Sequence, residues 1–389
     1  MKRKRIGISI ALAVTASMTF GAMNVLAESD YADKELWYYE TDNIAWCNYP
    51  TMYEHMAAMG LADSGFDIDA YVDSEMGEGV IKLLKNVILY QETDQEVMDY
   101  WTDLGIRKEL FHEDDAEKKF AVYTPEVVWS ETEKSNDTYP VIFCLHGGGN
   151  PIFAAESYGY AQLGATENYI TVMPEDCSIE SVSEILDFLC ENYPVDTTRV
   201  YSVGLSAGGN RSYMNATSSP ELFAAITACG QPILFNGTST PEELSELGGV
   251  AVYNIVGQYD AYNHYPFTID GFQTSEDKIS GFNQWIEANN LIYEDGELTK
   301  EKIEELYGNS EDIVICNTGI DFLTTYTIQA DGTDFWTGEF LNNDGINTLR
   351  VSMVKDGIHW TTKSYAELSW DFMKHFSRNS ETGQLVYTE

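Results

Sequence analysis

The sequence predicts an α/β protein, with a mainly parallel β-sheet covered by helices on both faces. From residue 119 onward, short apolar runs alternate with amphipathic stretches. Apolar runs of about four to eight residues are typical of strands buried on both faces, and parallel strands need a helical crossover between them. The residues suited to chemistry follow directly after such runs, as they do in open α/β sheets.

Helical spacing of apolar residues predicts the first helix, whereas continuous apolar runs predict the strands. A helix is predicted over 178–193, because Val182, Ile185 and Leu189 recur at helical spacing. The strands are apolar runs rich in β-branched and aromatic residues, at 120–124, 140–145, 169–173, 199–203, 250–256 and 349–354.

Three further helices are predicted, beginning near residue 210 and spanning 276–290 and 362–376. In the helix over 276–290, Ile279, Phe282 and Ile286 share one face, with Trp285 beside them. This pattern predicts packing against the core, and a lid over the site is the alternative.

The chain of 389 residues divides into three predicted parts. Residues 1–27 have a basic start, an apolar middle and small residues before Ala27, which predicts a secretory signal peptide cleaved after Ala27. An uncleaved membrane anchor is the alternative, but polar residues dilute the apolar run. Residues 28–115 are acidic and aromatic and form an N-terminal extension or accessory region. Residues 116–380 form the domain that carries the chemical motifs.

The charge of the chain limits its partners. The formal charge of −41 becomes −45 after cleavage, because the signal peptide holds four basic and no acidic residues. Such a surface excludes nucleic acid and anionic membranes as partners, and no other segment is apolar enough to span a bilayer. The six cysteines permit disulfides outside the cell but show no zinc-like spacing, so no metal site is expected. The oligomeric state stays open.

Gly204-Leu205-Ser206-Ala207-Gly208 fits the pattern G-x-S-x-G. It follows the strand predicted over 199–203 and precedes a helix, which is the setting of the nucleophile elbow in the α/β-hydrolase fold. A turn this sharp strains the backbone of the nucleophile, and small neighbours relieve the crowding. The sequence therefore predicts an α/β-hydrolase fold with Ser206 as nucleophile.

A second glycine-rich loop, His146-Gly147-Gly148-Gly149, follows the strand predicted over 140–145. Glycines let backbone N–H groups approach a developing oxyanion closely. The amides of Gly148 and Ala207 are the predicted oxyanion hole. An ordinary glycine-rich turn is the alternative.

The base must follow Ser206 in the chain, because this fold has the order serine, acid, histidine. His359 comes directly after the strand predicted over 349–354, where a loop can bring it to the serine. His375 falls inside the last helix and reads as a packed or solvated residue. His264 lies too close in sequence to the best acid, so His359 is the predicted base.

The predicted acid is Asp260, four residues beyond the apolar run that ends at Val256. The alternative for Asp260 is a turn-forming role. Asp270 precedes a glycine, as in an ordinary turn, and Asp277 lies near a helix start, where an acid favours the helix dipole. Trp360, next to the base, is a candidate contact for an acyl group, and a packing role is equally compatible.

The segments 196–209 and 370–378 resemble secreted esterases, the group of polyhydroxybutyrate depolymerases and feruloyl or acetylxylan esterases. The resemblance extends over about residues 116–378. It implies hydrolysis of carboxylic esters through an acyl-enzyme, with Ser206, Asp260 and His359 at the matching positions. Two departures, the 99 residues from the acid to the base and the N-terminal region, would reshape the acyl pocket, so substrate specificity does not carry over.

These observations predict an exported serine carboxylester hydrolase that needs no cofactor and acts on ester substrates, with polyesters and plant polysaccharide esters as candidate polymers. Two rivals remain open. A serine peptidase of the prolyl-oligopeptidase type shares the fold and the order of the three residues. An inactive hydrolase scaffold that only binds its ligand is the third possibility, and the complete set of catalytic residues argues against it.

Overall fold

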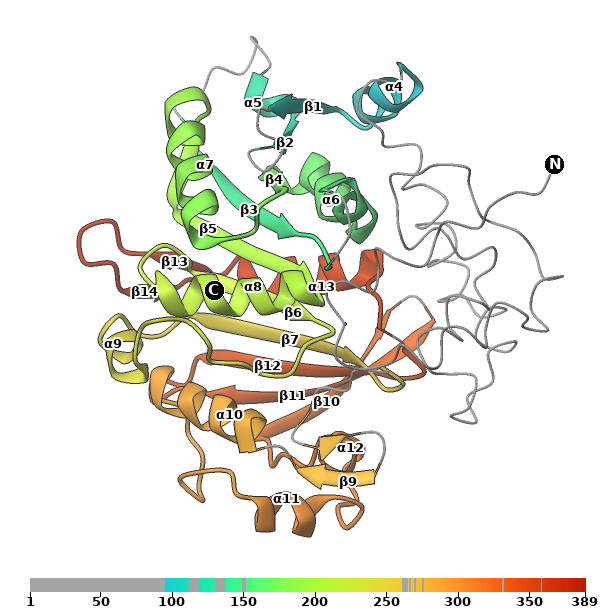
Figure 1. Ribbon diagram of the computed structural model, residues 1–389, viewed down its shortest axis with the longest axis vertical. Helices are drawn as coiled ribbons and strands as arrows, with labels where there is room; N and C mark the ends of the chain where they lie inside the picture. The colour runs from blue at the N-terminus through green and yellow to red at the C-terminus, as the bar shows by residue number, and fades with distance from the viewer. Residues whose placement is uncertain are drawn as a thin grey trace, which may run out of the picture.

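A ten-stranded β-sheet runs through the computed structural model, in the order β1-β2-β4-β3-β5-β6-β7-β12-β11-β10 (Figure 1). The model describes residues 95–111, 119–129, 137–148, 152–260, 265, 267–268, 271–274, 276–330, 332–357 and 359–389. The sheet consists of β1 (Ile106–Phe111), β2 (Phe120–Pro125), β3 (Tyr139–Leu145), β4 (Ile170–Pro174), β5 (Val195–Leu205), β6 (Ala225–Cys229), β7 (Ala251–Gly257), β10 (Thr324–Ala330), β11 (Thr333–Leu341) and β12 (Asn347–Val354). Two small hairpins lie outside it, β8 (Phe267–Thr268) with β9 (Gly271–Thr274) and β13 (Phe376–Arg378) with β14 (Leu385–Tyr387).

The helices connect and cover these strands. They are α4 (Gln95–Asp103), α5 (Glu126–Trp129), the 3₁₀ helix η7 (Ile152–Tyr158), α6 (Tyr160–Glu167), α7 (Ile179–Asn192), α8 (Ala207–Ser218), α9 (Pro241–Glu246), α10 (Glu276–Ala288), α11 (Lys300–Leu306), α12 (Ile313–Thr318) and α13 (Lys363–Met373).

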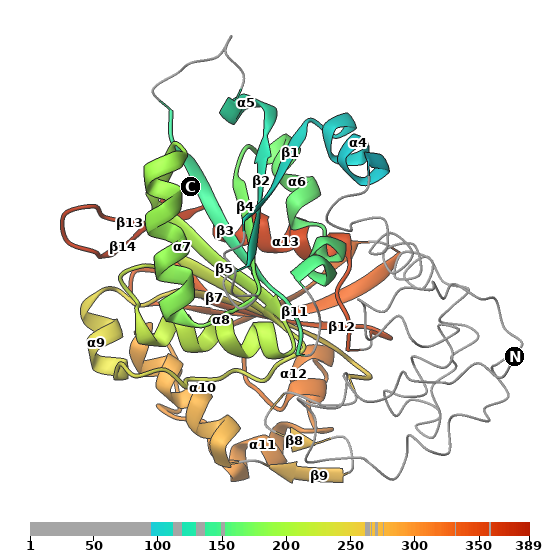
Figure 2. The ribbon, with the colours of Figure 1, turned by 45° about the horizontal axis from the view of Figure 1, so that its top comes forward.

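The central strands β4, β3, β5, β6, β7 and β12 pair in parallel, whereas β1, β2, β10 and β11 extend the sheet with antiparallel pairs. Helices α6 and α13 cover one face, and α7, α8 and α10 cover the other (Figure 1 and Figure 2). This arrangement confirms the predicted α/β-hydrolase fold, because crossover helices on both faces are what a parallel sheet requires.

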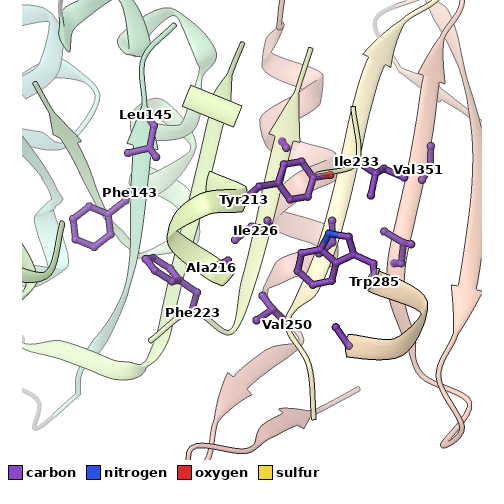
Figure 3. Close-up of a cluster of buried hydrophobic side chains, with 14 of the residues drawn as sticks. Phe143, Leu145, Tyr213, Ala216, Phe223, Ile226, Ile233, Val250, Trp285 and Val351 are labelled. Atoms are coloured by element: carbon purple, nitrogen blue, oxygen red, sulfur yellow. The ribbon is translucent and has the colours of Figure 1, made fainter. Parts of the chain in front are cut away.

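Two hydrophobic clusters form the core, one on each face of the sheet. Period-two alternation along a strand sends neighbouring residues to opposite faces. In β3, Cys144 joins the cluster under α13, whereas Phe143 and Leu145 join the cluster under α8. Figure 3 shows the second cluster, with Tyr213 of α8 and Trp285 of α10 packed over the strands.

Helix α10 packs against the core, as its pattern predicted. Phe282 and Trp285 are buried, and the Trp285 indole N–H donates to the Leu234 carbonyl at 2.7 Å. Ile279 and Ile286 are only partly buried, so the buried face is rotated toward Phe282 and Trp285. The segment after α10 adds β10 and β11 to the sheet.

The predicted strands and helices all occur, with small shifts at their ends. The sequence pattern missed four strands of the main sheet: β1, β6, β10 and β11. Strand β6 reads Ala-Ile-Thr-Ala-Cys, so Ile226 is the only bulky apolar residue in a run of five. Strand β1 lies upstream of residue 116 and pairs along its whole length with β2. The sheet therefore includes residues ahead of that expected boundary.

Several sequence-based expectations fall outside the described residues, namely the signal peptide, most of the extension over 28–115, Cys47, Gly149, His264 and Asp270. Within the described part, Cys144, Cys177, Cys190, Cys229 and Cys316 are free thiols. None of the helices described there combines the length and apolar character that crossing a bilayer requires.

Candidate active site

Ser206 occupies a strained turn between β5 and α8. Its φ of 56° and ψ of −118° match the first central position of a type II′ turn, where glycine is the usual residue. Two hydrogen bonds hold this conformation: the Ser206 N–H donates to the Cys229 carbonyl at 2.9 Å, and the Ser206 carbonyl accepts from Asn210 N–H at 3.0 Å. Strain of this kind persists only where the surroundings fix it, and it is common at functional sites.

Glycines let the turn fit between the strand and the helix. A Cβ on Gly204 would lie 2.3 Å from the carbonyl carbon of Gly208, and a Cβ on Gly208 would lie 2.1 Å from the Leu145 oxygen. Both distances are far below a van der Waals contact, so neither position accepts a side chain. The small residues thus allow the first turn of α8 to approach β3 and β5, as the G-x-S-x-G pattern predicted.

His359 and Asp260 contact each other directly. The His359 Nδ1 lies 2.8 Å from Oδ2 and 3.0 Å from Oδ1 of Asp260. Asp260 follows β7 and His359 follows β12, and these strands are parallel neighbours, so both loops leave the same edge of the sheet. Asp260 is 1% exposed and His359 7% exposed. A buried carboxylate at this nitrogen keeps a proton on Nδ1 and leaves Nε2 as the basic nitrogen.

Gly230 brings the imidazole close to the strained turn. It follows β6, and a Cβ built on it would lie 2.8 Å from Cε1 and 2.9 Å from Nδ1 of His359. The preceding carbonyl, that of Cys229, accepts the Ser206 N–H. The ring of His359 therefore packs against Gly230, directly after the residue whose carbonyl binds the Ser206 N–H. Sequence reasoning missed Gly230, because β6 gave too weak a signal to show which strand end it follows.

The glycine-rich loop follows β3, the strand next to β5. The Gly147 N–H donates to the Tyr158 hydroxyl at 3.2 Å, so that amide is engaged within the protein. This favours the Gly148 amide as an oxyanion donor. The Ala207 amide is the first in α8 and has no carbonyl partner within the helix, as is general for helix N-termini.

His146 anchors this loop to the chain that follows β4. Its Nδ1 lies 2.9 Å from the Gly147 carbonyl, and its Nε2 lies 3.0 Å from the Glu175 carbonyl. Both acceptors are satisfied only if both ring nitrogens carry a proton. Burial opposes this charge, but the contact with the Cys177 side chain and the two carbonyls outweigh burial and raise the His146 pKa to about 10.

The other candidates occupy different surroundings. Trp360 is 6% exposed and belongs to the hydrophobic cluster under α13, which favours its packing role. Asp277 is an exposed acid in the first turn of α10. His375 follows α13, where its Nδ1 contacts the Thr388 carbonyl at 2.9 Å.

Comparisons with known proteins gave short alignments to two enzymes, whereas no family model matches the chain. The chain is 28% identical over 116 residues to a poly(3-hydroxyalkanoate) depolymerase of Paucimonas lemoignei, and 25% identical over 146 residues to a bifunctional acetylxylan esterase/xylanase of Neocallimastix patriciarum. The alignments cover 24% and 34% of this chain, and 28% and 21% of those proteins. These similarities agree with the predicted resemblance to depolymerases and acetylxylan esterases.

Among solved structures, an acetyl xylan esterase from Aspergillus awamori superposes with a TM-score of 0.43 at 12% identity, over 69% of this chain and 99% of that chain.

Proposed function

We propose that this chain is a serine hydrolase of carboxylic esters, with Ser206 as nucleophile, His359 as base and Asp260 as the acid that orients the base. The observation that carries the proposal is the buried pairing of Asp260 with His359 at the sheet edge where Ser206 is held in a strained turn. Nucleophile, base and orienting acid are the three parts that this chemistry needs.

The proposed reaction has two steps. His359 Nε2 takes the proton of the Ser206 hydroxyl while its oxygen attacks the ester carbonyl, and the Gly148 and Ala207 amides stabilise the oxyanion. The protonated imidazole gives its proton to the departing alcohol, which leaves an acyl-enzyme. Water then attacks the acyl group with the same base, and this releases the acid and the free serine.

Two relatives support a polymeric ester as the class of substrate. A depolymerase of poly(3-hydroxyalkanoate) and an acetylxylan esterase both cleave esters on polymers, which supports a polymeric ester as substrate here. The formal charge of −41 disfavours polyanionic substrates. We further propose that the chain is exported and that its signal peptide is cleaved after Ala27.

A fluorophosphonate probe tests the nucleophile. Wild-type protein should be labelled once per chain, on the peptide that contains Ser206, and Ser206→Ala should lose both labelling and turnover. Asn210→Ala, one helical turn away, is the control for disturbance of α8 and should still be labelled. Labelling that survives in Ser206→Ala would show that another residue is the nucleophile.

Paired assays separate the rival functions. We expect hydrolysis of p-nitrophenyl esters of short acids, and release of acid from acetylated xylan, feruloylated xylan or polyhydroxybutyrate. Faster cleavage of an aminoacyl amide than of the matched ester would favour the peptidase. No turnover and no labelling would favour an inactive binding scaffold.

A further inference from the structure

Lys108 and Glu156 form an ion pair that lies wholly inside the protein. The Lys108 Nζ lies 2.8 Å from the Glu156 Oε1, and the two side chains are 2% and 0% exposed. Tyr123 donates a hydrogen bond to the same carboxylate oxygen. Lys108 is on β1 and Tyr123 stands opposite it on β2, so the last two strands at one end of the sheet hold one carboxylate.

Stability alone does not account for a buried pair of this kind. Removing two charges from water is unfavourable, and well-packed apolar residues often stabilise a fold equally well. Among the described residues, the Glu156 Oε2 is buried without a hydrogen-bond partner. Burial raises the Glu156 pKa to about 7, although Lys108 and Tyr123 act to lower it. Burial therefore disfavours the ionised form of this carboxylate.

Glu156 belongs to η7, the 3₁₀ helix that supports the glycine-rich loop. Tyr158 of the same helix accepts the Gly147 N–H at 3.2 Å, next to the Gly148 amide. The other end of η7 is held by Ile152, whose N–H donates to the Glu175 carboxylate at 3.3 Å. Between these contacts, Glu156 fixes the middle of η7 to the sheet edge.

We propose that Lys108 and Glu156 are positioning residues for the oxyanion site. Their ion pair holds η7 against β1 and β2, and η7 holds the Gly147 peptide through Tyr158, which sets the direction of the Gly148 amide. Lys108 comes from the segment before residue 116, so that segment would supply part of the support for the site. The inference rests on the proposed esterase function.

Glu156→Gln and Tyr158→Phe test the two links of this chain of contacts. The loss of one oxyanion donor lowers kcat by about 10²–10³-fold, so a displaced donor should lower kcat by roughly 10–100-fold. We expect this loss with KM changed less than about threefold, since positioning acts on the transition state. The assay uses p-nitrophenyl acetate at a temperature well below the thermal unfolding midpoint of each variant.

Glu339→Gln is the matched control. Glu339 pairs with Arg350 at 2.9 Å between β11 and β12, and both side chains are mostly buried. It should lose stability to a similar degree and keep its kcat. The double variant Lys108→Met/Glu156→Leu removes both charges and provides a folded protein if Glu156→Gln unfolds. The kcat of this double variant should stay low even where its stability recovers.

Hydrogen exchange supplies a readout that does not depend on esterase activity. Amides in the peptide over 146–158 should exchange faster in Glu156→Gln, whereas Glu339→Gln should change exchange only over 333–354. If the wild type turns over no ester, the proposed function fails, and the exchange data still decide whether the pair holds the loop. Unchanged exchange over 146–158, or a kcat within twofold of wild type in both Glu156→Gln and Tyr158→Phe, would overturn the inference.

Discussion

The Asp260 carboxylate lies 2.8 Å from the Nδ1 of His359, although the two residues are 99 positions apart in the chain. The segment between them includes α10, α11, α12, β10 and β11, of which β11 pairs with β12 and β10 pairs with β11. The chain can leave β7 and return at β12 because the two strands are adjacent. The length of the excursion therefore does not disturb the contact at its two ends.

Replacement of Asp260 by Asn should lower kcat by about 10⁴-fold, because the amide cannot hold the imidazole in the required tautomer. Asp277→Asn is the control, since this acid is exposed at the start of α10, and its effect should stay below about tenfold. Measurement of kcat for both variants, with circular dichroism to monitor folding, tests the assignment. Near-normal activity in Asp260→Asn would exclude Asp260 as the acid.

Ser206→Gly should abolish turnover and stabilise the fold by about 1 kcal/mol, because glycine adopts a φ of 56° without strain. Ser178→Gly is the matched control, since Ser178 caps α7 with a φ of −68° and accepts the Ser181 N–H. That variant should lose a few tenths of a kcal/mol instead. Urea unfolding of both variants against wild type measures the difference. A destabilised Ser206→Gly would argue that the turn stores no strain.

Gly230→Ala should lower kcat/KM by about 10²-fold, because misplacement of a reacting group by about 1 Å has that effect. The new Cβ would lie 2.8 Å from Cε1 of His359, so the ring must move. Gly296→Ala is the control for backbone strain: its φ is +80°, but a Cβ there would meet nothing within 4 Å. It should lose about 1 kcal/mol of stability with kcat/KM unchanged. Equal kinetics in both variants would contradict the proposed ring contact.

His146 should make stability depend on pH in alkaline solution. Its folded pKa of about 10 lies above its ordinary value of 6.5, so the folded protein binds the proton more tightly than the unfolded chain. This contribution is complete below about pH 6.5 and is lost as the pH rises toward 10. The stability difference between wild type and His146→Gln should therefore shrink by on the order of 1–3 kcal/mol between pH 6 and pH 10. Urea unfolding across that range measures it, and a constant difference would mean that His146 is not charged in the fold.

The sequence by itself determined the fold class and the candidate residues. Apolar runs with turn signals marked six strands of the sheet, because large apolar residues from these strands fill the space under the covering helices. The pattern G-x-S-x-G marked Ser206, because a strand-to-helix turn of this sharpness excludes side chains at Gly204 and Gly208. The order of elements then pointed to Asp260 and His359 as partners.

Only the tertiary structure decided which groups meet across the sheet. Strand β6 is built mostly of small residues and is stabilised by its neighbours β5 and β7. Its local sequence therefore carries little signal, and the position of Gly230 at its end could not be recognised. The raised pKa of His146 depends on the Cys177 side chain and on two carbonyls, and the Glu175 carbonyl belongs to a residue 29 positions further along the chain. The pairing of Lys108 with Glu156 depends on β1 lying at the sheet edge. Contacts of this kind are set by the packing of distant segments, which local periodicity does not encode.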